Sequence, residues 1–106
     1  NSYKYIQSNI QSLPFKNNAF DIVTCNHTLE HIIEVKQAFY ELCRICKHKL
    51  IITIPCQRYY YYTLDEHINF FTHEEMIFSI LGVNKKHLLS CDKIQGDWVV
   101  IFNFME

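Results

Sequence analysis

Two patterns of apolar and polar residues alternate along the chain: continuous apolar runs typical of strands, and apolar residues three and four apart, typical of a helix. Together they predict a layered α/β domain. Residues 20–25 are apolar or β-branched on both faces, which is typical of a strand buried on both sides in a parallel sheet. Residues 50–54 repeat this pattern, and Pro55 ends the run. Between the two runs, apolar residues three and four apart predict a helix over roughly 32–47. This order predicts two parallel strands joined by a right-handed crossover.

Weaker signals flank this unit. Residues 3–7 alternate weakly and predict a short first strand, while capping-box spacing at the start of 72–81 predicts a second helix that Gly82 ends. Residues 88–94 and 98–104 predict two closing strands joined by a hairpin turn. We therefore expect the 106 residues to form a single α/β domain. Its sheet would be mainly parallel with an antiparallel C-terminal strand, and helices would pack on it.

Composition narrows the classes of function. The chain is 49% hydrophobic with a formal net charge of -1, so it lacks the basic patch that nucleic acids and anionic membranes attract. No apolar run approaches the ~20 residues of a membrane-spanning helix. Five Cys at irregular spacing argue against a disulfide framework. We expect a cytoplasmic protein without nucleic-acid or membrane partners.

Six short segments follow one another in an order that carries more information than any one of them. They are Leu13-Pro14-Phe15, Phe20-Asp21-Ile22-Val23, Leu29-Glu30-His31-Ile32, Glu41 to Lys47, Leu50 to Pro55 and His67 to Thr72. Together they resemble class I S-adenosylmethionine-dependent methyltransferases of the small-molecule type, from about residue 5 to the end of the chain. The resemblance implies a Rossmann-like sheet of seven strands. This chain would be the C-terminal portion of that domain and would supply strands three to seven.

The resemblance also assigns roles to particular positions. Asn9 aligns with the residue that hydrogen-bonds the adenine amino group, and Ile10 with the residue whose backbone N–H meets the adenine ring. Asn26 and His27 stand where the family contacts the methionine part of S-adenosylmethionine and its methyl group. Methyl transfer from a sulfonium mainly needs alignment of a small-molecule acceptor, and a base is needed only for a hydroxyl or an acidic carbon. His27 and His67 are the candidate catalytic bases.

The family's glycine-rich turn and its acidic ribose ligand are absent from the chain. The two glycines, Gly82 and Gly96, lie far from any such position. Without that turn no backbone approaches the cofactor closely, so we predict that the chain alone neither binds S-adenosylmethionine usefully nor methylates an acceptor. The missing strands would also leave the edge of strand 20–25 exposed, so the natural protein would be longer or the isolated chain would self-associate.

Two other functions compete with methyl transfer. One is a non-catalytic binding or regulatory remnant that docks to a partner through the exposed edge of strand 20–25. The other is a zinc peptidase, because His27-x-x-Glu30-His31 matches an inverted zinc-peptidase motif if residues 27–31 form a helix. The ordinary structural alternative places Glu30 as a cap or in solvent and packs His31 under the following helix. No metal site is assigned.

Three local features have structural interpretations. Cys43-x-x-Cys46 lies at the C-terminal end of the predicted helix, where thiolates are not favoured, so core packing is expected. Glu41 and Arg44 are expected to form a surface pair. Tyr59 to Tyr62 is either an aromatic wall over an acceptor or an exposed loop, and the sequence does not separate these.

Overall fold

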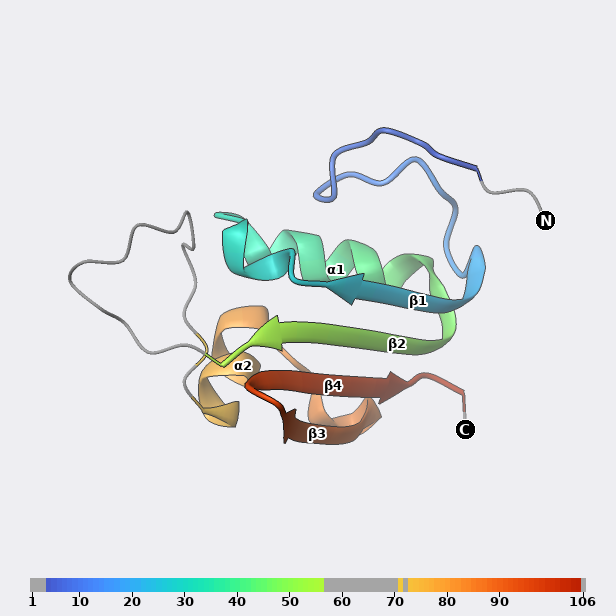
Figure 1. The fold of residues 1–106 in the computed structure, drawn as a ribbon. Helices are drawn as coiled ribbons and strands as arrows, with labels where there is room; N and C mark the ends of the chain where they lie inside the picture. The colour runs from blue at the N-terminus through green and yellow to red at the C-terminus, as the bar shows by residue number, and fades with distance from the viewer. Residues whose placement is uncertain (1–3, 57–70, 72, 106) are drawn as a thin grey trace.

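The computed structural model describes residues 4–56, 71 and 73–105 (Figure 1). Two α-helices and four strands form its framework, and two 3-10 turns, η1 and η2, connect them. The elements are β1 (Phe20–Asn26), η1 (Leu29–His31), α1 (Val35–Ile45), β2 (Cys46–Pro55), α2 (Glu74–Leu81), η2 (Lys85–His87), β3 (Leu88–Ile94) and β4 (Asp97–Asn103). None of the helices in this part of the chain has the length and apolar character needed to cross a membrane.

The four strands form one sheet in the order β1-β2-β4-β3. β1 and β2 pair in parallel, whereas β4 is antiparallel to both β2 and β3. Three strands therefore run in one direction and only the C-terminal strand runs against them, as Figure 1 shows. The predicted fold class is confirmed: a partial Rossmann-like sheet with helices packed on it.

The helices cover one face of the sheet (Figure 1). Because side chains alternate along a strand, the register sorts the strand residues into two faces. The covered face carries Val23, Cys25, Leu50, Ile52, Ile54, Val100 and Phe102, all of which are buried except the half-buried Val23. The open face carries Ile22, Thr24, Ile51, Thr53, Val99 and Ile101, all of which are half-buried or exposed. The rings of Phe39 on α1 and Phe102 lie 5.4 Å apart and join the helix layer to the covered face.

Two turns follow the conformations that the sequence predicts. Gly82 ends α2 with φ 74, and its N–H and that of Val83 both donate to Phe78 O at 3.0 and 2.9 Å. Gln95 and Gly96 form the hairpin between β3 and β4 with φ values of 49 and 85. Positive φ at both central residues matches the twist of the flanking strands.

Four sequence predictions need correction. The described residues 4–7 of the expected first strand form no strand, because no neighbouring strand offers them hydrogen-bond partners in the described chain. The helix expected over 32–47 begins at Val35 and ends at Ile45, because residues 32 and 46 are extended. The second helix begins at Glu74, and its N-cap is His73, which makes no side-chain cap hydrogen bond. Thr72, the residue expected to start a capping box, lies outside the described residues.

The fourth correction concerns burial. β1 and β2 were expected to be buried on both sides, but each is buried on one face only. In the described chain both helices lie on the covered face, so nothing shields Ile22, whose exposed fraction is 60%. The apolar residues of the open face thus have the composition of a buried surface without its burial.

Candidate functional site

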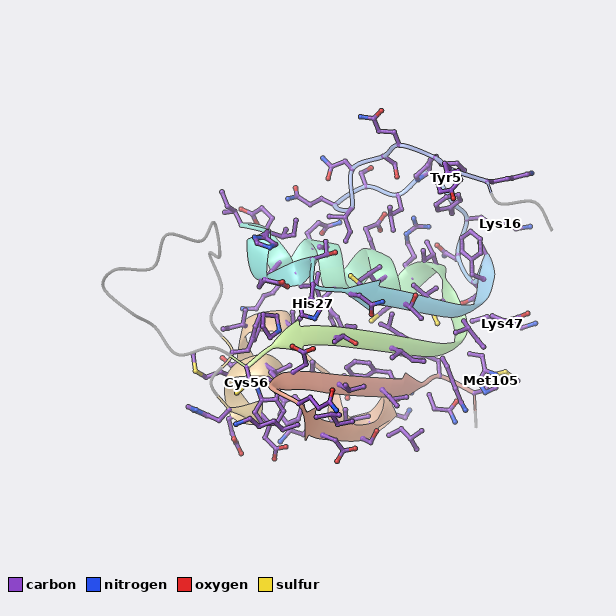
Figure 2. All side chains as sticks on the ribbon, viewed as in Figure 1. Tyr5, Lys16, His27, Lys47, Cys56 and Met105 are labelled. Atoms are coloured by element: carbon purple, nitrogen blue, oxygen red, sulfur yellow. The ribbon has the colours of Figure 1, made fainter. Side chains whose placement is uncertain are left out.

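The carboxyl ends of β1 and β2 meet at one rim of the sheet, and His27 stands there immediately after β1. Figure 2 shows its side chain close to the ends of these two strands. The backbone N–H of His27 donates to Thr53 O on β2 at 2.8 Å, which continues the pairing of β1 and β2 by one residue. His27 has φ 50, a left-handed conformation that non-glycine residues rarely adopt. The chain therefore turns sharply at this residue and leaves the ring half exposed at the rim.

Two carboxylates lie near the His27 ring, and a second imidazole, that of His31, lies near one of them. His27 Nε2 lies 3.1 Å from Asp97 Oδ2 at the start of β4, so this contact spans the carboxyl end of β2. Its Nδ1 lies 4.0 Å from Glu30 Oε2, and His31 Nε2 lies 3.7 Å from the same oxygen. The rim thus joins two imidazoles and two carboxylates from η1, the turn before it and the hairpin.

Glu30 is the most buried polar residue of the rim, with an exposed fraction of 1%. Its Oε1 has no hydrogen-bond partner among the described residues. The expectation that Glu30 caps a helix or faces solvent is therefore wrong, and His31 is exposed rather than packed under α1. A buried carboxylate is unfavourable unless positive charge or hydrogen-bond donors compensate it. The two imidazoles beside Glu30 can supply such compensation.

The zinc-peptidase motif requires residues 27–31 to form an α-helix, and the structure shows that they do not. His27 is left-handed and residues 29–31 form a 3-10 turn, so His27 and His31 do not lie one α-helical turn apart. Within residues 4–56, 71 and 73–105, no three His, Cys, Asp or Glu side chains are grouped to hold a metal ion.

The other predicted cofactor residues are Asn9, Ile10 and Asn26, and the structure places them in two different settings. Asn9 Oδ1 accepts a hydrogen bond from Gln11 N at 2.9 Å, and Gln11 O accepts one from Gln37 Nε2 at 3.1 Å, which ties the turn to α1. Ile10 packs against the core from this turn. Asn26 is the exposed last residue of β1. The structure therefore places Asn26 and His27 next to each other at the rim, and the Asn9 turn beside the first half of α1.

Two site predictions lie outside the described residues. These are the second candidate base, His67, and the aromatic run Tyr59 to Tyr62. The neighbouring Phe71 is described and fully buried, and its carbonyl accepts a hydrogen bond from Trp98 Nε1 at 3.0 Å. Phe71 is therefore part of the hydrophobic core.

A second polar network fastens the loop at 13–17 to α1. The Arg44 guanidinium donates to Leu13 O, Phe15 O and Asn17 Oδ1 at 2.6–3.0 Å, and to Glu41 at 2.7 and 3.0 Å. Glu41 Oε1 also accepts from Leu13 N at 2.7 Å. Glu41 and Arg44 are therefore not the surface pair that their spacing suggested, because Glu41 is buried and both residues satisfy loop backbone. The hydrogen bond from Arg44 lowers the pKa of Glu41; burial opposes this and Leu13 N–H supports it.

The cysteines behave as core residues. Burial raises the pKa of Cys43 to about 12, with help from nearby Cys46, and burial also raises the pKa of Cys46 and Cys25. A raised thiol pKa keeps the thiolate scarce, which excludes the reactive form that redox motifs need. The core interpretation of Cys43-x-x-Cys46 is confirmed.

Asp97 is the rim residue that sequence reasoning did not find. It was assigned to the hairpin turn, and its partner His27 lies 70 positions earlier. No local pattern links the two, since the contact depends on β4 pairing with β2. The available signal was the position of Asp97 beside the predicted hairpin turn. A strand that begins there and runs antiparallel to β2 brings Asp97 to the carboxyl end of β2.

Comparison with known proteins identifies a matching family and relatives that match part of the chain. A family model described as "Methyltransferase domain" matches residues 1–53, half of the chain. An uncharacterized protein of Methanocaldococcus jannaschii is 47% identical over 51 residues, which are 46% of this chain and 22% of that protein. An uncharacterized methyltransferase of Bacillus subtilis is 36% identical over 44 residues, which are 42% of this chain and 17% of that protein. The chain thus spans about a fifth of the length of these relatives.

Solved structures extend the likeness to nearly the whole chain. A SAM-dependent methyltransferase from Aquifex aeolicus superimposes with a TM-score of 0.71 at 16% identity. The match covers 96% of this chain and 55% of that one. At this identity the likeness concerns the fold, and it includes the closing hairpin that the family model does not reach.

Proposed function

Because the chain belongs to the methyltransferase domain family, we propose that it forms the C-terminal part of an S-adenosylmethionine-dependent methyltransferase that acts on a small molecule. The open face of the sheet is the observation that carries this proposal. It presents the apolar side chains Ile22, Ile51, Val99 and Ile101, which the described helices leave uncovered. A sheet with helices on both faces would bury them, and the Aquifex structure is nearly twice as long as the part that this chain matches.

The residues present fit the cofactor only in part. Asn26 offers its amide group at the rim, and the Asn9 turn offers a side-chain amide beside the first half of α1. No glycine serves a strand-to-helix turn, because Gly82 ends α2 and Gly96 lies in the β3–β4 hairpin. The cofactor, when bound to a complete domain, supplies an electrophilic methyl group. The chain's own part would be to contact its adenine and methionine ends and to present the acceptor.

A fusion protein tests the proposal. The part of the Bacillus relative that precedes its match to this chain would be joined to residues 1–106, and cofactor binding would be measured by calorimetry. We expect micromolar binding of S-adenosylmethionine and its demethylated product by the fusion and no such binding by the isolated chain. Within the fusion, Asn9→Ala should weaken binding about tenfold, the effect of one hydrogen bond, whereas Asn9→Asp keeps the acceptor oxygen and the turn. Micromolar binding by the isolated chain, or none by a folded fusion, would contradict the proposal.

The exposed edge of β1 favours a second candidate function. Phe20 and Ile22 are 40% and 60% exposed on a strand that has β2 as its one neighbour in the described part of the chain. Such an edge can pair with a strand of another polypeptide, which is how a non-catalytic remnant would dock. This function predicts a folded fusion that does not bind the cofactor, so the same calorimetry separates the two candidates.

A further inference from the structure

The His27 ring lies between two carboxylates, one facing each of its nitrogens. Asp97 Oδ2 is 3.1 Å from Nε2, within hydrogen-bond distance. Glu30 Oε2 is 4.0 Å from Nδ1, close enough for electrostatic interaction but too far for a hydrogen bond. The two carboxylates therefore have different effects on the ring, and each effect follows from its distance.

Asp97 fixes the position of the ring hydrogen. An ionised carboxylate only accepts hydrogen bonds, so the contact with Asp97 requires the hydrogen to be on Nε2. A neutral imidazole carries one hydrogen, which leaves the lone pair on Nδ1. Asp97 thus selects Nδ1 as the nitrogen of His27 that accepts a proton.

Glu30 acts on the charged form of the ring. Its carboxylate is buried and its Oε1 lacks a hydrogen-bond partner in the described chain. Positive charge nearby is what stabilises such a group, and the imidazolium form of His27 places that charge 4.0 Å away. His31 Nε2, at 3.7 Å, faces the same oxygen from the other side and adds to the field when protonated. Glu30 therefore faces the charge that the ring would carry after Nδ1 has taken a proton.

The backbone supports a functional role for this arrangement. His27 holds φ 50, and its N–H is tied to Thr53 O at 2.8 Å. Residues in such sparsely populated conformations persist only where surrounding contacts hold them, and they are concentrated at functional sites. The turn keeps the ring at the rim, half exposed, above the carboxyl end of β2.

We propose that Asp97 and Glu30 are positioning residues for His27, whose Nδ1 takes a proton from the methyl acceptor. This inference rests on the proposed methyl-transfer function. In the step, the bond between hydrogen and an acceptor oxygen or acidic carbon breaks, and its electron pair stays on the acceptor as the nucleophile. An N–H bond forms at Nδ1, and both carboxylates face the resulting imidazolium. The acceptor class is therefore a hydroxyl compound or an acidic carbon, because a neutral amine or a thioether needs no base before it attacks.

Chemical modification with diethyl pyrocarbonate tests this arrangement on the 106-residue chain. The reagent acylates the imidazole nitrogen that carries the lone pair, and mass spectrometry with NMR identifies which nitrogen is modified. We expect the His27 adduct on Nδ1 in the wild type. Asp97→Ala should raise the share of Nε2 adduct about tenfold, the change that one hydrogen bond produces. Asp97→Asn should raise this share as well, because its side-chain amide can donate to Nε2 where a carboxylate can only accept. Asp92→Ala removes an exposed carboxylate from β3 and is the matched control.

The wild type alone also decides the question if Asp97→Ala does not fold. In alkaline solution, ¹⁵N spectra of histidine-labelled chain should show hydrogen on Nε2 and a lone pair on Nδ1 of His27. Hydrogen on Nδ1, or a wild-type adduct on Nε2, would overturn the inference. Neither experiment uses cofactor or acceptor, so such a result would contradict the inference about His27 without contradicting the proposed function. The proposed function is contradicted only by the fusion experiment.

Discussion

The two faces of the sheet carry side chains of the same chemical kind but bury them to different degrees. Ile52 on the covered face is fully buried, whereas its neighbour Ile51 on the open face is half-buried, and the same contrast holds between Val100 and Val99 on β4. A strand that is half solvated in its final state normally alternates apolar and polar residues. The burial of one face indicates that packing stabilises the sheet mainly from that side. The missing alternation indicates that the strands have a composition suited to burial on both sides.

The largest expected effect tests this contrast with one pair of substitutions. Ile52→Ala should lower the free energy of unfolding by about 2–5 kcal/mol, because it removes fully buried methyl groups and leaves a cavity. Ile51→Ala makes the same chemical change one residue away, and we expect a loss of about 1 kcal/mol or less because the side chain is partly solvated already. Urea denaturation of both variants measures the difference.

If Ile52→Ala prevents folding, the milder pair Ile52→Val and Ile51→Val still allows the loss of stability to be compared between the two faces. A buried Ile→Val change costs about 0.5–1.5 kcal/mol, so the covered-face variant should remain measurable. Equal losses at the two positions would show that the open face is covered in solution. They would remove the main support for the proposal that this chain forms the C-terminal part of a larger domain.

The strands could be predicted well because their signals are local. β1 and β3 lie where apolar runs predicted them, and the hairpin follows from Gly96 in a turn between two such runs. β2 contains its predicted run but begins at Cys46, four residues before it. The direction of β4 follows from the hairpin as well. The runs could not reveal that one face is open, because burial depends on what packs there and not on the strand itself. Residues 4–7 were predicted as a strand for the same reason, and the ladder they need is absent from the described chain.

The candidate site was less predictable than the fold. His27 could be singled out because the family resemblance implies a cofactor contact directly after the strand at 20–25, but its partners could not be predicted. Asp97 reaches it only through the pairing of β4 with β2, and the burial of Glu30 depends on how η1 packs. The contacts of Arg44 could not be predicted for the same reason. Spacing on a helix indicates that Glu41 and Arg44 can meet, but it does not indicate that both bind the loop at 13–17.

The second-largest effect is the loss of stability when Glu41 no longer pairs with Arg44, and this loss depends on pH. Because the hydrogen bond from Arg44 lowers the pKa of Glu41 in the folded state, ionised Glu41 stabilises the fold above its unfolded pKa. This contribution is lost as the pH falls through the lowered pKa. Glu41→Gln should therefore be less stable than the wild type at neutral pH, and the two unfolding curves should converge in acid. Glu34→Gln, at an exposed position just before α1, is the control and should show no such convergence.

The smallest effect on stability is expected at the open face, where a change should act on association instead. Ile22 is 60% exposed on β1, which has a free edge in the described chain, so Ile22→Lys should change the free energy of unfolding by about 0.5 kcal/mol or less. A lysine there opposes strand pairing and the stacking of open faces between copies. If the isolated chain self-associates, as its uncovered apolar surface predicts, sedimentation velocity should show Ile22→Lys shifted toward the monomer. Leu89→Lys, another exposed apolar residue on the opposite edge strand, is the matched control. Equal shifts from both variants would mean that general surface polarity governs association, whereas a shift from Ile22→Lys alone would assign it to the β1 side of the sheet.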